Sequence, residues 1–221
     1  MRILITAGGT REYIDPVRFI SNASSGRMGY ALARAALKAG HKVTLITAPT
    51  AQKPPSTAKI IAVETAAQMF EAVKKHLRGC DCLIMAAAVA DYTPVRPAKT
   101  KMKKSGKHLT IQLKPTADIL KWAGKHKKKR QFVVGFALED RSLQRRAEQK
   151  LQEKNLDVIV ANTPAAVGAA RTSVLIKTPG RKWLKLHKAS KATVARKIIS
   201  LAERIRKRDG KWKRELKESF C

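Results

Sequence analysis

The residues best suited to chemistry lie in a glycine-rich segment near the N-terminus. This segment follows an apolar run, residues 3–7, and leads into an alanine- and leucine-rich run, residues 28–37. A link between a buried strand and a helix offers backbone N–H groups and a helix N-terminus to an anion, although turns and a helix cap are the alternative role. The predicted phosphate or substrate loop comprises Gly8, Gly9, Thr10, Ser24, Ser25 and Gly26.

The spacing of these glycines differs from the common nucleotide fingerprints. Gly26 is far from Gly8 and Gly9, whereas a dinucleotide-binding turn has G-x-G-x-x-G directly after the first strand. No lysine follows the loop as in a P-loop, and no acid follows the second strand. An NAD(P)-dependent oxidoreductase is therefore only an alternative hypothesis.

A second group of polar residues follows the apolar run 82–89. Asp91 comes after this run, where an open α/β sheet binds its ligands, or it simply begins a turn before Pro94. Residues 92–107 form a long segment rich in proline and lysine, with Lys101 among its cations. Loops of this length commonly serve as lids or binding loops.

The chain is extremely basic. It has 221 residues with 47 Lys and Arg against 16 Asp and Glu, a net charge of +31. Such a field attracts nucleotides, phosphorylated substrates or RNA. Residues 125–130 resemble a nucleic-acid patch, but no aromatic residues interleave with the cations, so a solvated surface is favoured over an RNA-binding module.

Several features bear on where the protein works. No run of eighteen apolar residues predicts a membrane span, and the N-terminus enters a strand directly, unlike a signal peptide. The three cysteines, Cys80, Cys82 and Cys221, lack zinc-site spacing and are expected to be free thiols. We therefore expect a cytoplasmic protein with no membrane partner.

Alternating strand and helix patterns predict an α/β fold: a doubly wound, mostly parallel Rossmann-like sheet with helices on both faces and a terminal β-hairpin. One domain is expected over residues 1–209, followed by a basic tail, 210–221. Expected strands are 3–7, 42–47, 59–63, 82–89, 109–113, 131–137 and 157–162, with a hairpin of 173–176 and 183–186. Expected helices are 28–37, 65–77, one opening at 116–120, 141–154 and 192–208.

Four separated motifs resemble the phosphopantothenate–cysteine ligase family. They cover the segment from Gly8 to Gly26 and three later blocks, and the resemblance extends to about Arg208. The later blocks are Ala86-Ala87-Ala88-Val89-Ala90-Asp91-Tyr92 with Lys101-Met102-Lys103-Lys104, Val134-Gly135-Phe136-Ala137, and residues 154–162.

The resemblance implies a ligase of coenzyme A biosynthesis. Such enzymes activate 4'-phosphopantothenate with a nucleoside triphosphate and join it to L-cysteine; bacterial members use CTP through an acyl-cytidylate, and eukaryotic relatives commonly use ATP. It further implies Mg²⁺, a homodimer with the site near its interface, no flavin on this chain, and a separate phosphopantothenoylcysteine decarboxylase. No metal ligands are predicted.

The resemblance also implies roles for individual residues. Asn22 corresponds to the asparagine that contacts the acyl-nucleotide carbonyl, with Arg18 and Ala88 beside it, and Lys101 to a lysine of a strap that closes over the phosphates. Further nucleotide contacts correspond to Met85, Ala86, Ala87, Asp91, Ala117, Asp118, Ile119, Leu120, Phe136, Lys150 and Lys154. The chemistry suits these types, because cations and amide donors stabilise the negative charge that gathers when a carboxylate attacks a phosphate.

Overall fold

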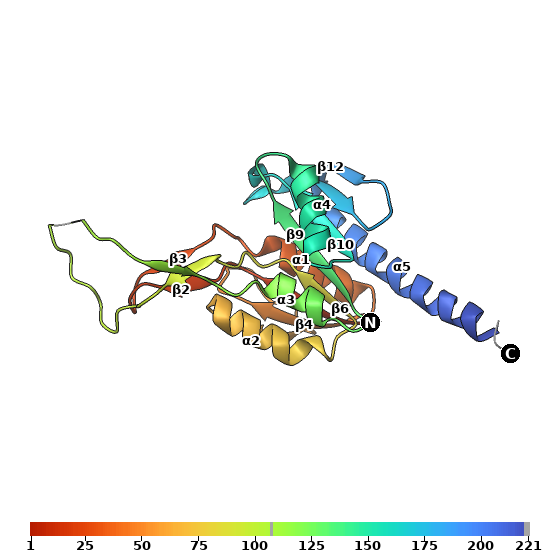
Figure 1. Cartoon of the computed structure of the whole chain (residues 1–221), viewed down its shortest axis with the longest axis horizontal. Coiled ribbons are helices and arrows are strands. Elements are labelled where there is room, and N and C mark those ends of the chain that lie inside the picture. Colours follow the sequence, from red (N-terminus) through yellow and green to blue (C-terminus); the bar gives the residue numbers. More distant parts are fainter. Residues whose placement is uncertain (107, 219–221) are drawn as a thin grey trace.

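The fold is organised around one eight-stranded sheet in the order β12-β11-β10-β9-β6-β1-β4-β5 (Figure 1). The computed structural model describes residues 1–106 and 108–218, with side chains described as far as residue 207. The six neighbouring strands β10, β9, β6, β1, β4 and β5 run parallel to one another. The two edge strands β11 and β12 pair antiparallel. The strands are β1 (Arg2–Ala7), β4 (Lys42–Thr47), β5 (Lys59–Ala62), β6 (Cys82–Met85), β9 (Phe132–Leu138), β10 (Val158–Asn162), β11 (Arg171–Lys177) and β12 (Leu184–Ser190).

Helices cover both faces of this sheet. On one face α1 (Arg27–Lys38) and α5 (Lys191–Glu218) pack over a core that contains Ile3, Ile5 and Ile198. On the other, α2 (Ala66–Leu77), α3 (Ile119–His126) and α4 (Leu143–Glu153) cover a second core. The neighbouring central strands β6 and β9 carry no polar or charged side chain, because both faces of the sheet are buried there. The predicted doubly wound fold with a terminal hairpin is thus confirmed.

An arm extends from the carboxyl ends of the parallel strands (Figure 1). We define the arm as two antiparallel strand pairs, β2 (Arg11–Tyr13) with β3 (Phe19–Ser21) and β7 (Tyr92–Pro94) with β8 (Leu113–Pro115), together with the segment that connects the two strands of each pair. The segment between β7 and β8 is called the strap, and its described residues, 95–106 and 108–112, reach furthest from the sheet. The arm was not predicted from the sequence.

Local sequence signals mark the ends of several elements. Thr65 caps α2 in a reciprocal capping box with Gln68, and Gly40, with φ 76°, follows the end of α1. Asn155 takes the left-handed conformation just after α4, and Gly180 lies in the turn of the terminal hairpin. These signals depend only on neighbouring residues, which is why the sequence contains them.

Other predictions need correction. β6 ends at Met85 rather than at residue 89, because Ala88 and Ala90 turn aside to bond Gly8 and Thr10. Residues 109–112 form no strand. Among the described residues of the strap, the backbone hydrogen bond that this stretch makes to the opposite side is the one from the Val95 amide to the Gln112 carbonyl oxygen. α5 continues to Glu218, through most of the predicted tail; residues 219–221, including Cys221, lie outside the described part of the chain.

Ser24 and Ser25 are of a residue type that commonly caps helices, but the N-cap of α1 is Gly26, with φ 69° and no side-chain cap. A Cβ at Gly26 would lie 2.8 Å from Thr50 Oγ1, so this turn requires glycine. Ser24 Oγ instead accepts a hydrogen bond from the Gly26 amide at 3.3 Å.

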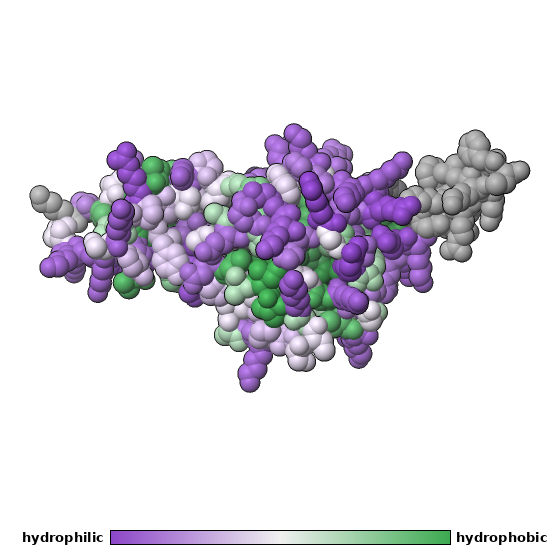
Figure 2. All heavy atoms as spheres, turned by 90° about the horizontal axis from the view of Figure 1, so that it is seen from below, coloured by the Kyte–Doolittle hydropathy of each residue, from purple (hydrophilic) through white to green (hydrophobic). Residues whose placement is uncertain are grey.

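Hydrophilic side chains dominate the face shown in Figure 2, in keeping with the high charge of the chain. Cys80 and Cys82 are buried free thiols, as predicted, and burial raises the pKa of both. None of the helices in the described residues is long and apolar enough to cross a membrane.

Candidate active site

A cleft of about 730 Å³ lies at the carboxyl ends of β6, β9 and β10, beside the start of α1. It occupies the place where the strand order reverses around β1, which is where open α/β sheets bind their ligands. Most of the predicted site residues line it, although they come from separate parts of the chain. They are Asn22, Ser24, Ser25, Gly26, Met85, Ala86, Ala87, Ala88, Asp91, Ala117, Asp118, Ile119, Leu120, Phe136, Lys150 and Lys154.

Gly8, Gly9 and Thr10 lie outside the lining of this cleft. All three are buried, and they support the segment that follows β6: the Ala88 amide donates to Gly8 O at 2.8 Å, and the Ala90 amide donates to Thr10 Oγ1 at 2.9 Å. A Cβ on Gly9 would approach the Asn22 carbonyl oxygen to 2.8 Å. Their contribution in this structure is therefore to bring two loops together rather than to face a ligand.

Asn22 lies where these two loops meet. Its side-chain amide donates a hydrogen bond from Nδ2 to the Val89 carbonyl oxygen at 2.9 Å, and this fixes the orientation of the amide. Asn22 and Ala88 both line the cleft. One Nδ2 hydrogen is left to donate to a ligand, because a primary amide carries two.

Two lysines supply positive charge on the side of the cleft formed by α4. Lys154 Nζ pairs with Asp118 Oδ2 at 2.8 Å, while Asp118 Oδ1 caps α3 by accepting from the Lys121 amide. Burial opposes ionisation of Asp118, but the hydrogen bonds from Lys154 and from the Lys121 amide, together with the charges of Lys154 and Lys150, outweigh it and lower the pKa of Asp118. Burial, together with the charge of Lys154, lowers the pKa of Lys150. An anion bound here would favour the charged form of Lys150.

The sequence analysis missed two further cations of the cleft, Arg27 and Lys191. Arg27 NH1 donates to the Gly168 carbonyl and Lys191 Nζ to the Ala166 carbonyl, each at 3.3 Å, so both hold the segment after β10 against the cleft. Arg27 adjoins Gly26 and could have been included with the loop. Lys191 carried no sequence signal, because only the packing of α5 on α1 places it there.

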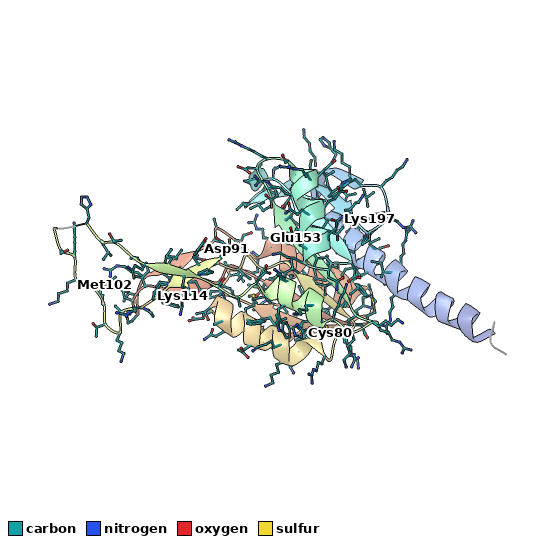
Figure 3. The ribbon with its side chains drawn as sticks, in the orientation of Figure 1. Cys80, Asp91, Met102, Lys114, Glu153 and Lys197 are labelled. Carbon is teal, nitrogen blue, oxygen red and sulfur yellow. The ribbon has the colours of Figure 1, made fainter. Side chains whose placement is uncertain are left out.

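Arg18 and Lys101 lie on the arm and do not line the cleft of the same chain. Arg18 forms an ion pair with Asp15 and donates to the Met102 carbonyl at 3.1 Å. Figure 3 places Met102 near the far end of the arm, well away from Asp91 at the cleft. The two cations predicted to act on the reacting groups are thus close to one another but remote from the nucleotide residues of their own chain.

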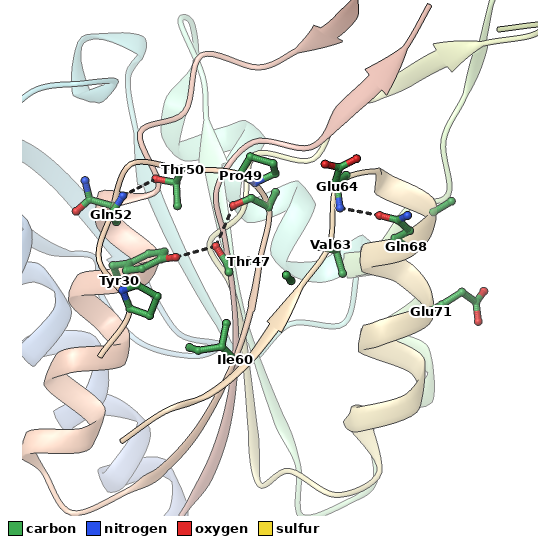
Figure 4. A pocket seen from close by; sticks show the side chains of 14 residues that line it. Tyr30, Thr47, Pro49, Thr50, Gln52, Ile60, Val63, Glu64, Gln68 and Glu71 are labelled. Atoms are coloured by element: carbon green, nitrogen blue, oxygen red, sulfur yellow. Dashed lines mark hydrogen bonds between the residues drawn. The ribbon is translucent and has the colours of Figure 1, made fainter. Parts of the chain in front are cut away.

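A second cavity, of about 950 Å³, lies on the opposite side of β1 from the cleft (Figure 4). Tyr30 and Thr47 join in a buried hydrogen bond of 3.1 Å at its wall, and Ile60 and Val63 contribute apolar surface. Its lining contains neither lysine nor arginine, and none of the predicted site residues. The cleft is therefore the better candidate for a site that binds phosphates.

Metal binding has little support from side chains alone. Within the described residues, no group of three or more His, Cys, Asp or Glu side chains is arranged to hold a metal ion. Asp91 and Glu139 do line the cleft, and Mg²⁺ commonly binds one or two carboxylates together with substrate phosphates.

Comparisons with known proteins identify the family to which the chain is similar. Residues 1–205 match the family model of the DNA/pantothenate metabolism flavoprotein C-terminal domain. Among curated relatives, the coenzyme A biosynthesis bifunctional protein CoaBC of Bacillus subtilis is 50% identical over 168 residues, 76% of this chain and 41% of the relative. A cysteine/cysteine sulfinic acid decarboxylase of an unknown prokaryotic organism is 44% identical over 209 residues, 90% of this chain and 58% of the relative.

One solved structure is similar to this chain in both fold and sequence. The crystal structure of the C-terminal domain of CoaBC has a TM-score of 0.80 and 40% identity, covering 92% of this chain and 94% of that one. The chain spans about half the length of the curated relatives it matches. With the family model matched over nearly the whole chain, this protein belongs to the family of the DNA/pantothenate metabolism flavoprotein C-terminal domain.

Proposed function

We propose that this chain is a phosphopantothenate–cysteine ligase that uses CTP. The observation that carries the proposal is the cleft, which gathers Asn22, the strand end at residues 85–88, and Lys150 with Lys154 at one edge of the sheet. The family and the similarity to CoaBC, a coenzyme A biosynthesis protein by name, support the same reaction. The decarboxylase of the next step would be a separate activity.

In the first half-reaction, a carboxylate oxygen of 4'-phosphopantothenate attacks the α-phosphorus of CTP. The bond from this phosphorus to the β-phosphate oxygen breaks, giving an acyl-cytidylate and pyrophosphate. Two anions must approach, so the ammonium groups of Lys150 and Lys154 and the N-terminus of α1 would offset their repulsion. Mg²⁺ would enter with the triphosphate, with Asp91 and Glu139 as its available carboxylates, and would neutralise the phosphate charge.

In the second half-reaction, the amine of L-cysteine attacks the acyl carbon. The bond from that carbon to the CMP oxygen breaks, the amine nitrogen loses a proton, and an amide and CMP result. Negative charge develops on the carbonyl oxygen as the amine adds. The remaining Nδ2 hydrogen of Asn22, held in place through Val89, is suited to donate to this oxygen.

A homodimer would complete the site with the arm of the partner. Lys101 and Arg18 lie far from the cleft of their own chain, and the arm exposes apolar side chains that a second copy could cover: Val17 is 58%, Phe19 41% and Tyr92 54% exposed. Green side chains stand out among purple ones on the arm at the left of Figure 2. A closed two-fold contact would carry each strap to the other cleft.

Complementation between two inactive variants tests this arrangement. Lys101→Gln removes the cation of the strap, and Asn22→Asp removes the amide donor of the cleft. If the strap acts in the partner's cleft, a randomly exchanged mixture regains about a quarter of wild-type activity, because half of the dimers carry one intact site of two. If it acts in its own cleft, no heterodimer has an intact site and the mixture stays inactive.

The reaction itself is tested by offering CTP or ATP with 4'-phosphopantothenate and L-cysteine while pyrophosphate release is followed. We expect sustained turnover that requires all three substrates and is faster with CTP, whereas without L-cysteine only the first half-reaction proceeds. Equal or faster turnover with ATP would overturn the nucleotide assignment. Absence of pyrophosphate with either nucleotide would overturn the ligase assignment.

A further inference from the structure

A basic groove of about 410 Å³ lies between α1 and the beginning of α5 and adjoins the cleft. We call it the α1–α5 groove. Arg27 and Lys191 line both the groove and the cleft, so the two are continuous. Small side chains line the groove between its cations, namely Ala31, Ala35, Ala170 and Ala192.

The cations of the groove form two facing rows. Arg27, Arg34 and Lys38 are seven and four residues apart on α1, a spacing that places them on one face over about 16 Å of helix. Lys191 and Arg196 face them from α5. The start of this long helix adds a partial positive charge of its own.

Negative charge does not balance these rows. The lining of the groove contains no acidic residue. Among the described side chains, none of the five cations takes part in an ion pair with an acid. Holding five like charges around one groove costs free energy that a polyvalent anion would recover.

The most enclosed of these cations, Lys191, shows the effect of this crowding. Burial and the nearby charge of Arg27 lower its pKa, and its described hydrogen bond is to a neutral carbonyl, that of Ala166. An anion bound between Lys191 and Arg196 would offset the like charge and stabilise the protonated amine. The groove is thus built for a negatively charged ligand rather than for a neutral one.

We propose that the α1–α5 groove binds a condensed inorganic phosphate of the pyrophosphate and tripolyphosphate class. A chain of phosphates carries several negative charges along its length, matching the two rows of cations. No aromatic residue lines the groove, so it lacks the stacking platform that bases of a nucleic acid would use. The inference depends on the groove and not on the ligase reaction.

Calorimetric titration of the full chain with sodium tripolyphosphate, without nucleotide, tests the proposal. We expect saturable binding that Arg34→Gln/Arg196→Gln weakens at least about tenfold, since two of five charges are lost. The matched control is Lys125→Gln/Lys129→Gln, which removes two exposed charges near α3 on the other face of the sheet. Equal losses in both double variants would mean a diffuse basic surface and would overturn the site.

Two further titrations separate the groove from the cleft and from a nucleic-acid surface. If tripolyphosphate occupied the cleft instead, saturating CTP would abolish its binding; we expect binding to persist. If an oligouridylate also bound, and Arg34→Gln/Arg196→Gln weakened its binding as much as that of tripolyphosphate, the ligand would be a nucleic acid and the proposal would fail. Lys38→Gln changes one exposed residue at the end of α1 and should also weaken tripolyphosphate binding. If the double variant unfolds, this single variant takes its place in the test.

Discussion

The backbone amide of Met102 donates a hydrogen bond to Asp15 Oδ2 at 3.2 Å, joining the strap to the β2–β3 hairpin across 87 residues of sequence. Asp15 also accepts from the amides of Val17 and Arg18, each at 2.8 Å, and pairs with the Arg18 guanidinium. Burial opposes its ionisation, but these hydrogen bonds prevail and lower the pKa of Asp15 to about 2. Asp15 therefore holds the strap at Met102 and so positions Lys101, the residue before it; we call Asp15 the latch.

Replacing the latch should loosen the strap without touching the cleft. Asp15→Asn removes the charge that holds Arg18 and weakens the bond from Met102. We expect faster tryptic cleavage within the strap and about tenfold slower acyl-nucleotide formation, on the scale of losing a charge-assisted hydrogen bond. Asp140→Asn, an exposed acid outside the arm, is the control. Unchanged strap cleavage in Asp15→Asn would show that Asp15 stabilises only the hairpin.

The pH dependence of the latch follows from its depressed pKa. An aspartate whose folded pKa lies below the ordinary value of 3.8 contributes stability above that value and loses it as the pH falls toward about 2. Tryptic protection of the strap in the wild-type chain should accordingly be constant between pH 6 and pH 9. A loss of protection within that range would contradict the assignment to Asp15.

Two lysines of the strap allow a matched comparison. Lys99 and Lys101 are both exposed and only two residues apart. If Lys101 reaches the phosphates in a closed site, Lys101→Gln should slow acyl-nucleotide formation by about a hundredfold or more. Lys99→Gln should cost only a few-fold, through weaker electrostatic attraction. Pyrophosphate release without cysteine isolates this step, and similar losses in both variants would reduce the strap to a diffuse basic patch.

Elements defined by contacts between residues close in sequence were predicted, whereas elements that depend on contacts between distant residues were not. β4 was predicted with its exact bounds, and β1 to within one residue, because continuous apolar runs bounded by turns identify buried strands locally. The arm was missed because β7 pairs with β8 across the whole strap, and no local pattern encodes that pairing. The same holds for the cleft: residues near strand ends could be placed, whereas Lys191 enters only through helix packing.

Asn22 permits a test of the second half-reaction. Asn22→Asp keeps the shape of the side chain but removes the Nδ2 donor, so it loses the bond to Val89 and would repel an oxyanion. We expect acyl-cytidylate to accumulate while its transfer to cysteine slows by about 3–4 kcal/mol in activation free energy. Gln144→Glu, the same change from amide to acid at an exposed position of α4 outside the cleft lining, is the control. If pyrophosphate release fell as much as the overall rate, Asn22 would belong to the first step instead.

Gly124 sets the position of Lys154 through a close backbone approach. A Cβ on Gly124 would lie only 1.8 Å from the Lys154 carbonyl oxygen, so Gly124→Ala must push the end of α4 away from α3. We expect a loss of about 1–3 kcal/mol in unfolding free energy and a raised KM for CTP, because Lys154 lines the cleft. Gly79→Ala, where the nearest atom would be 3.7 Å away, is the control and should do neither.

Lys150 predicts how nucleotide affinity depends on pH. Burial and the charge of Lys154 lower its pKa, so the free protein loses this cation at a lower pH than an ordinary lysine would. An anionic nucleotide binds the protonated form better and therefore raises the pKa, which means that affinity falls as the pH rises through the depressed value. Lys150→Arg keeps its charge at every accessible pH, because the guanidinium is always protonated. Titrations with CTP between pH 7 and pH 10 should show an alkaline loss of affinity in the wild type that this variant flattens. An alkaline loss of the same size in both proteins would assign the titration to another group.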